Sequence, residues 1–339
     1  MGYFYSPSQL VNYFKARRGG HSSLCNNEPL QICLYLTDRC TLNCTWCLRQ
    51  SESSENYGNG FEKKRDDLTL ERAKEILKFF PNAGHVNFAG FGEPLMVNDL
   101  FRINAAFKKR PMRTSMITNG TLLLERLNDI LQANFKYISI SLNSLDAKGY
   151  SITCGSSENT FYNVLKGIQL LVEKRKSSKP RVHISFVLTR DLFYRTPEIV
   201  KLAQELRVDC LDLHNVISHN NYNDYDNVLT VDDEEVVTKI SEWKNQKYTV
   251  HINWPRLVKK GLEKPARICK PLWNWLGIDM EGNTAGCHKA MGTDKKYGNI
   301  FKEGNMVWNN DFRRNLRNSF LEGCTFAYDC CRTCVVDQP

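Results

Sequence analysis

Residues 36–50, LTDRCTLNCTWCLRQ, hold three cysteines in the spacing C-x3-C-x2-C: Cys40, Cys44 and Cys47. Three thiols this close together indicate a disulfide, a zinc site or an iron–sulfur cluster, and the spacing alone excludes none of them. A disulfide uses two sulfurs and a structural zinc uses four ligands, so three thiols match the number required by neither. Three thiolates on a [4Fe-4S] cube leave one iron without a protein ligand, so a small molecule could bind there.

The cysteine loop directly follows an apolar, β-branched run at residues 30–37, LQICLYLT, which predicts a buried strand. Residues 68–80, LTLERAKEILKFF, carry apolar side chains at intervals of three and four and predict a helix. The same alternation continues along the chain. It predicts further strands at 85–91, 113–118, 136–142, 181–189 and 210–217, and helices at 97–109, 121–134, 160–175 and 196–207. Six strands separated by helices indicate a parallel sheet, in which the loops after the strands carry the chemistry.

The chain has 339 residues, a formal net charge of +9 and 13 cysteines. This length allows one large domain with a small appendage. No run approaches eighteen apolar residues, and the N-terminal basic cluster follows the aromatic residues, an order unlike a secretory signal. We therefore expect a cytoplasmic protein without a membrane segment. Many cysteines in such a chain favour metal or redox chemistry, and the scattered basic residues argue against a nucleic-acid partner.

The alternation of strands and helices stops in the last third of the chain, where six of the 13 cysteines follow residue 265. Residues 270–286, KPLWNWLGIDMEGNTAG, predict a hairpin that turns at Glu281 and Gly282. The predicted parts of the chain are an N-terminal extension (1–29), an α/β barrel (30–246), a linker (247–264) and a small cysteine-rich α+β appendage (265–339).

Four features in this order resemble the radical S-adenosylmethionine (SAM) superfamily. They are the cysteine loop, AGFGEP at 89–94, ITNGTLL at 117–123 and SISLNS at 139–144. The resemblance covers nearly the whole chain and implies a partial (β/α)6 TIM-like barrel. It also implies a [4Fe-4S] cluster on the three loop cysteines, with SAM on the open iron. Reduction of that cluster would cleave SAM to methionine and a 5'-deoxyadenosyl radical.

The resemblance further assigns cofactor contacts to residues at the ends of the predicted strands. The turn at 92–94 would offer backbone acceptors to the SAM amine, and glycine allows that close approach. Phe91 stands where the family more often has glycine. The cofactor-binding residues implied in this way are Trp46, Gly92, Glu93, Pro94, Asn119, Ser141 and Asn143.

The C-terminal cysteines resemble the family's twitch or SPASM appendage, which implies a second, auxiliary [4Fe-4S] cluster. Cys331 and Cys334 form a C-x2-C pair that suits two corners of one cluster or of one zinc ion. Cys330 or Cys324 in place of Cys331, and zinc in place of the cluster, remain alternatives. The predicted ligands are Cys269, Cys287, Cys331 and Cys334.

Several residues outside these motifs are also candidates for a functional role. Cys154, in the segment 151–157 that we predict as a loop after the fourth strand, could donate a hydrogen atom to a substrate radical. Cys33 and Cys210 are predicted to be core residues and Cys25 to have no special role. His214, after the sixth strand, is predicted to be a structural histidine.

The expected activity is radical SAM chemistry on a small polar substrate: a sugar, an aminocyclitol or an amino-acid derivative. The expected outcome is two-electron oxidation with the auxiliary cluster as electron acceptor, and flavodoxin or ferredoxin as electron donor. The 29 residues before the first strand are too few for the recognition domain of related peptide modifiers, which favours a small molecule. Alternatives are redox-neutral epimerisation, modification of a ribosomally made peptide, RNA modification, and a non-catalytic metal-stabilised binding module.

Overall fold

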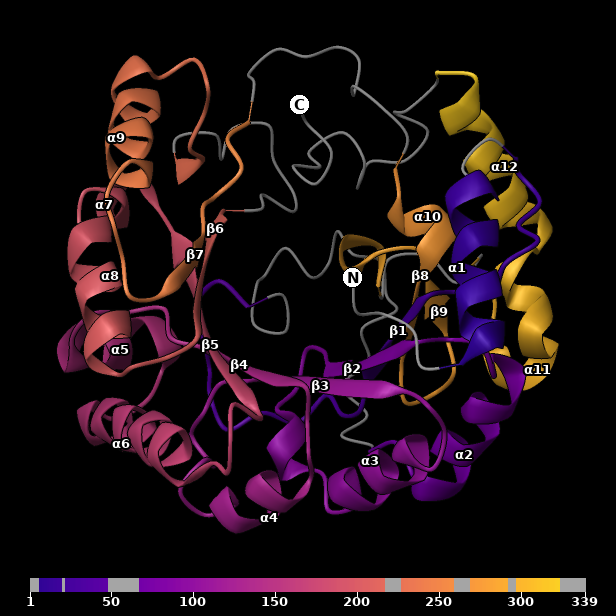
Figure 1. The fold of residues 1–339 in the computed structure, drawn as a ribbon, viewed down its shortest axis with the longest axis horizontal. Coiled ribbons are helices and arrows are strands. Elements are labelled where there is room, and N and C mark those ends of the chain that lie inside the picture. The colour runs from indigo at the N-terminus through magenta and orange to yellow at the C-terminus, as the bar shows by residue number, and fades with distance from the viewer. Residues whose placement is uncertain are drawn as a thin grey trace.

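The computed structural model describes residues 6–19, 22–47, 67–216, 227–258, 269–291 and 297–323. Within these residues one sheet has the strand order β7-β6-β5-β4-β3-β2-β1-β8-β9. Neighbouring strands are parallel except in the β8–β9 hairpin. The sheet curves without closing, so the fold is an α/β, partial TIM-like barrel (Figure 1). The strands are β1 Gln31–Tyr35, β2 His85–Ala89, β3 Arg113–Thr118, β4 Tyr137–Ser141, β5 Arg181–Leu188, β6 Cys210–Asn215, β7 His251–Asn253, β8 Trp275–Ile278 and β9 Thr284–Ala285.

Helices cover the convex outer face of this sheet. Helices α2 to α8 follow one another around strands β2 to β6, while α1, α11 and α12 lie on the side of β8 and β9 (Figure 1). Among the described residues, no helix combines the length and the apolar character that crossing a membrane requires. The helices are α1 Pro7–Gly19, α2 Leu70–Phe79, α3 Leu100–Lys108, α4 Leu127–Gln132, α5 Ala147–Cys154, α6 Glu158–Lys174, α7 Arg190–Phe193, α8 Thr196–Glu205, α9 Glu234–Lys244, α10 Pro271–Asn274, α11 Ile300–Glu303 and α12 Asp311–Leu321.

The two faces of the sheet differ in polarity, as β5 illustrates. Val182, Ile184 and Phe186 are almost completely buried, whereas His183 and Ser185 between them are half-buried. Because side chains alternate between the two faces of a strand, one set packs against the helices and the other lines the concave inner face. We call the space enclosed by this inner face the lumen. Its lining is more polar than the outer layer of the core.

All six strands predicted from the sequence are confirmed, and so is the C-terminal hairpin. Two expectations need correction. The predicted linker, 247–264, contains β7, which pairs with β6. Within the segment 151–157, predicted as a loop, residues 151–154 form the last turn of helix α5, Ala147–Cys154. In addition, β8 of the cysteine-rich appendage pairs in parallel with β1, so the appendage extends the barrel sheet at its edge.

A buried arginine attaches the appendage to the rest of the fold. The Arg317 side chain in α12 is 0% exposed. Its guanidinium donates to the backbone oxygens of Leu272 at 3.0 Å, Ser23 at 3.1 Å and Trp308 at 2.8 Å. It also lies over the Trp308 ring, 4.9 Å from the centroid. One side chain thus ties together three segments that are distant in sequence.

Replacing Arg317 with leucine should lower the free energy of unfolding by about 3–5 kcal/mol, because several buried carbonyl groups lose their donor. Chemical denaturation followed by circular dichroism measures this change. The matched control is Arg314→Leu in the same helix, where an exposed arginine pairs with Asp311 at 3.7 Å. That change should cost about 0.5 kcal/mol or less. Equal destabilisation by the two substitutions would contradict the anchoring role.

Candidate active site

The three-cysteine loop lies at the carboxyl end of β1, where Cys40, Cys44 and Cys47 are all half-buried. Two backbone hydrogen bonds fasten the loop to the end of α5. Asn43 N donates to Cys154 O and Thr45 N donates to Thr153 O, both at 3.0 Å. A helix more than a hundred residues away along the chain therefore helps to determine the shape of this loop. We call residues 37–47 the cluster loop.

The residue after α5, Gly155, has to be a glycine for this contact. Its φ is +58°, in the left-handed region that favours glycine. A Cβ atom there would also lie 2.6 Å from the backbone oxygen of Asn43. The end of α5 and the cluster loop are therefore packed backbone against backbone.

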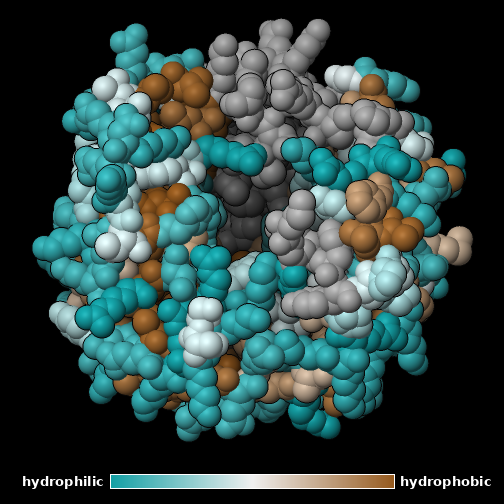
Figure 2. Space-filling view, in the orientation of Figure 1, coloured by the Kyte–Doolittle hydropathy of each residue, from teal (hydrophilic) through white to brown (hydrophobic). Residues whose placement is uncertain are grey.

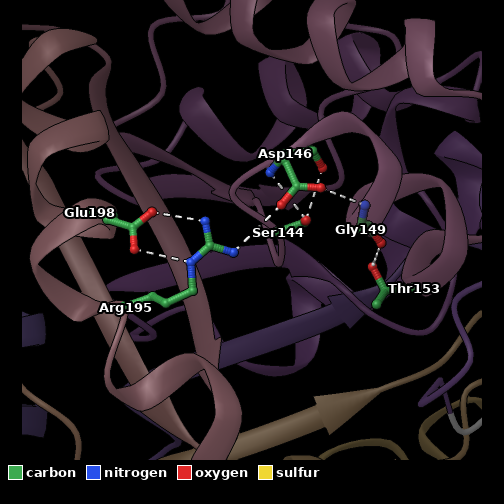
Figure 3. Close-up of polar contacts among 6 residues, drawn as sticks. All are labelled: Ser144, Asp146, Gly149, Thr153, Arg195 and Glu198. Carbon is green, nitrogen blue, oxygen red and sulfur yellow. Dashed lines mark hydrogen bonds and ion pairs between the residues drawn. The ribbon is translucent and has the colours of Figure 1, made fainter.

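Helix α5 is itself held in place at its start (Figure 3). The Asp146 carboxylate caps the helix by accepting from Gly149 N at 2.7 Å. Arg195 reaches Asp146 at 3.5 Å and Glu198 at 2.8 Å, which ties the cap to α8. Ser144 Oγ donates to the backbone oxygen of Asp146 at 3.0 Å. These contacts fix the support on which the cluster loop rests.

The turn at the end of β2 packs against the start of the cluster loop. Glu93 N donates to Arg39 O at 2.7 Å. A Cβ atom on Gly92 would lie 2.4 Å from Thr37 O and 2.5 Å from Arg39 O, so no larger residue fits there without movement. The turn and the cluster loop therefore form one backbone unit.

The Glu93 carboxylate is turned into the protein, where it is 1% exposed. It accepts hydrogen bonds from Thr118 Oγ1 at 2.6 Å, Asn119 N at 2.7 Å and Leu95 N at 3.0 Å. Burial raises the pKa of Glu93, while these three donors act in the opposite direction. The Glu93 side chain links the ends of β2 and β3. A SAM contact at this residue would therefore be made by its backbone atoms.

Asn119, which belongs to the third sequence motif (117–123), contacts the cluster loop. Its Nδ2 donates to Cys40 Sγ at 3.4 Å and to Thr41 Oγ1 at 3.0 Å. Asn143 follows the carboxyl end of β4, and its Oδ1 accepts from Val187 N at 3.1 Å. The remaining predicted cofactor residues are placed near the same ends of the strands or on the loop: Ser141 ends β4, Pro94 begins a buried turn after β2, and Trp46 is 47% exposed.

The donor set of the cluster loop fits a [4Fe-4S] cluster. All three donors are thiols, the ligands that such clusters use. Among the described residues, these thiols are not gathered within 4.8 Å of one another as ligands of one ion would be. A four-iron cube is wider than one ion. The SAM contacts of Trp46, Gly92, Glu93, Pro94, Asn119, Ser141 and Asn143 stay predictions.

Cys154 lies beneath the cluster loop. It is the last residue of α5 and is 3% exposed, and the nearby Cys44 side chain lowers the pKa of its thiol. The prediction that Cys154 lies in a loop was therefore wrong, because this residue ends an N-capped helix. A role for Cys154 as hydrogen-atom donor remains a prediction.

In the appendage, Cys269 and Cys287 flank the β8–β9 hairpin and are half-buried. The other predicted ligands, Cys331 and Cys334, and the alternatives Cys324 and Cys330, lie outside the described residues. The set of four ligands for an auxiliary cluster accordingly stays a prediction.

A tyrosine–histidine pair that sequence reasoning missed joins the two cysteine regions. Tyr35 ends β1, two residues before the cluster loop, and its hydroxyl lies 2.7 Å from Nδ1 of His288. His288 directly follows Cys287, and its ring lies 4.7 Å from that of Trp275. The His288 side chain is exposed to solvent.

The lumen wall formed by β5, β6 and β7 is polar, which sequence reasoning also missed. Nδ1 of His183 lies 3.0 Å from Asp212 Oδ2, and Asn253 Nδ2 donates to Asp212 Oδ1. Burial opposes ionisation of Asp212, but the hydrogen bonds from His183 and Asn253 prevail and lower its pKa to about 2. Ser185 and His214 complete this wall. The alternating polar positions within 181–189 and 210–217 were the available signal. Figure 2 shows a hollow at the centre of this face of the molecule, with hydrophilic side chains at its edge.

Comparisons with known proteins agree with this geometry. The sequence pattern of the radical SAM superfamily matches residues 34–192, from the end of β1 into α7, and this range includes the cluster loop. A radical SAM domain implies a [4Fe-4S] cluster and SAM as cofactors. The tungsten-containing aldehyde ferredoxin oxidoreductase cofactor-modifying protein of Pyrococcus furiosus is 24% identical, over 86% of this chain and 85% of that protein.

Two further proteins are similar to this chain. The PqqA peptide cyclase of Bradyrhizobium diazoefficiens is 25% identical over 56% of this chain, so the chain matches about half of that enzyme, 47% of its length. The crystal structure of Streptococcus suis SuiB bound to precursor peptide SuiA has a TM-score of 0.68 and 16% identity. The match covers 96% of this chain and 73% of SuiB. At that identity the likeness shows the fold.

Proposed function

Because residues 34–192 are a radical SAM domain, we propose that this chain abstracts a hydrogen atom from a small polar substrate and completes a two-electron oxidation. The proposed substrate class is a sugar, an aminocyclitol or an amino-acid derivative. When bound, a reduced [4Fe-4S] cluster and SAM supply the 5'-deoxyadenosyl radical that removes the hydrogen atom. An auxiliary cluster on Cys269, Cys287, Cys331 and Cys334 would supply the electron acceptor.

The observation that carries the substrate class is the polar lumen wall. His183, Ser185, Asp212, His214 and Asn253 all lie on strands β5 to β7, across the lumen from the cluster loop on β1. Hydroxyl and amino groups of a substrate would find further donors and acceptors on such a wall. The Pyrococcus relative, which matches almost end to end, is named for modifying a cofactor and so also favours a small molecule.

The chain's own residues would hold the reacting groups and move one proton. Asn119 and the turn at Gly92 fix the cluster loop from one side, and α5 fixes it from the other. Oxidation of an alcohol carbon requires loss of the hydroxyl proton after the hydrogen atom has left. With Nδ1–H donated to the Tyr35 oxygen, His288 presents Nε2 as the acceptor for that proton. Its place between the cluster loop and Cys287 suits this role.

The test is to incubate cluster-loaded protein with SAM, dithionite and carbon-deuterated members of the three substrate classes. A substrate should increase 5'-deoxyadenosine formation, transfer deuterium into 5'-deoxyadenosine, and give a product that lacks two hydrogens. Mass spectrometry detects both products. A product of unchanged mass with solvent hydrogen at the reacting carbon would favour epimerisation instead.

Replacing His288 with glutamine should lower oxidised product formation by about 10²- to 10⁴-fold, the contribution typical of a positioned base. Formation of 5'-deoxyadenosine should continue, because hydrogen abstraction precedes the proton transfer. Tyr35→Phe, which removes the hydroxyl that orients Nδ1, should give a smaller loss. Both products are quantified from the same reaction by mass spectrometry. A parallel loss of both products in His288→Gln would place the residue in SAM binding or folding.

Modification of a peptide is the second candidate, favoured by the similarity to the PqqA peptide cyclase. The same assay with peptides in place of small molecules separates the two candidates. Stimulation of 5'-deoxyadenosine formation by peptides alone would overturn the small-molecule proposal and leave the radical SAM chemistry intact.

A further inference from the structure

Three side chains of the types that bind metal ions in proteins lie together on the inner face of β5 and β6. This part of the lumen wall is different from the part that carries the cluster loop. His183 in β5 is the direct pairing partner of Cys210 in β6, and Asp212 follows two residues later on the same face. One donor atom from each residue lies within 4.8 Å of the other two. Among the described residues, this is the only group of histidine, cysteine and acidic side chains with that spacing.

The three donor groups lie close to the separations of a tetrahedral metal site. His183 Nδ1 lies 3.0 Å from one carboxylate oxygen of Asp212, Oδ2, and Cys210 Sγ lies 3.5 Å from the other, Oδ1. One nitrogen, one sulfur and one oxygen all lie within 4.8 Å of one another. Zinc bonds of about 2.0 Å to nitrogen or oxygen and 2.3 Å to sulfur separate tetrahedral donors by roughly 3.3–3.6 Å. Binding an ion would therefore need only small side-chain movements.

The surroundings hold these donors in place. The Tyr137 ring stacks on the imidazole of His183, with centroids 5.0 Å apart and an interplanar angle of 21°. Asn253 Nδ2 donates to Asp212 and lies 3.4 Å from Cys210 Sγ, a second layer of contacts that orients both ligands. Supporting contacts of this kind are typical of metal sites.

The charge of these three side chains also favours the binding of a cation. Within the described residues, no lysine or arginine forms an ion pair with Asp212, and its carboxylate instead contacts the His183 ring. The Asp212 side chain is only 19% exposed. A thiolate, a carboxylate and a neutral imidazole would bring a divalent cation to zero net charge in a partly buried site.

We propose that His183, Cys210 and Asp212 bind one zinc ion, with a solvent molecule from the lumen as the fourth ligand. The mixed sulfur, nitrogen and oxygen donors suit zinc, whereas magnesium and calcium require oxygen ligands. The ion would join β5 to β6 beside β7, the outermost strand on that side of the sheet. His183 and Asp212 also belong to the polar wall that supports the proposed substrate class, but zinc binding is measured without substrate or SAM, so its failure would leave the proposed reaction untouched.

The experiment measures zinc in cluster-loaded protein supplied with zinc sulfate and then freed of loosely bound metal. Wild type, Cys210→Ser, Asp212→Asn and the matched control Cys33→Ser are compared by mass spectrometry of the metals. Cys33 is an equally buried strand cysteine, in β1. We expect about one zinc per chain in wild type and in Cys33→Ser, and a loss of tenfold or more in the two ligand variants. Iron content and circular dichroism show that the variants are folded.

X-ray absorption at the zinc edge identifies the ligands without interference from iron. One sulfur at about 2.3 Å and three lighter atoms at about 2.0 Å are expected. A first shell of sulfur alone would place the zinc on the C-terminal cysteines and overturn the proposal. Absence of zinc from wild type, or zinc that is unchanged in Cys210→Ser, would overturn it as well.

Discussion

A chain with alanine in place of Cys40, Cys44 and Cys47 is expected to lose about four irons and all reductive cleavage of SAM, because these thiolates are the predicted ligands of the cluster whose open iron would bind SAM. Iron and sulfide are measured after anaerobic reconstitution, and 5'-deoxyadenosine after addition of SAM and dithionite. With an auxiliary cluster, wild type should hold about eight irons and the variant about four.

The matched control replaces Cys25 and Cys33, two buried cysteines outside the predicted ligand sets, and should keep both the iron and the cleavage activity. Persistent 5'-deoxyadenosine formation in the triple variant would contradict the assignment of the cluster loop. About four irons in wild type and none in the variant would leave the C-terminal cysteines with zinc or without metal. The electron-acceptor part of the proposed function would then fail, and redox-neutral hydrogen transfer would replace it.

Replacing Gly92 with alanine is expected to have the second largest effect. The new Cβ would lie 2.4 Å from Thr37 O and 2.5 Å from Arg39 O, and backbone oxygens cannot move aside as a flexible side chain can. We expect a loss of about 1–3 kcal/mol in the free energy of unfolding, as for overpacking in a core. Because both oxygens belong to the residues just before Cys40, iron loading of the cluster loop should also fall.

Thermal unfolding and iron content after reconstitution measure the two effects. The control is Gly323→Ala, where φ is +78° and a Cβ atom would have no neighbour within 4 Å. Backbone strain there should cost about 1 kcal/mol and leave the iron content unchanged. Normal iron loading in Gly92→Ala would show that the turn and the cluster loop are not coupled as their packing indicates.

Much of the fold could be predicted from the sequence, because strands and helices are encoded in short-range periodicity. The run before Cys40 alternates with helical segments five times, and each predicted strand was confirmed at its position. The cluster loop was also predictable, since parallel strands place the loop after β1 at the functional end of the sheet. Trp46 and the turn at Gly92 could be proposed from the sequence because their motifs are contiguous in the chain, and their SAM contacts stay predictions.

The site residues that the sequence did not reveal depend on long-range neighbours. Local patterns placed His183 and Cys210 on strands, but only the β5–β6 register sets them side by side with Asp212. Tyr35 and His288 are separated by 253 residues and have no shared motif. The helix that supports the cluster loop was read as a loop, because its short sequence has little apolar periodicity.

The sequence by itself determined that a three-cysteine loop follows the first strand of a parallel α/β sheet, since both facts are local. Only the tertiary structure decided that β7 continues the sheet into the predicted linker and that β8 joins β1, because strand pairing depends on which edges meet. It also decided that Glu93 points inward to Thr118 and Asn119. A buried carboxylate needs donors, and the fold supplies them from a neighbouring strand.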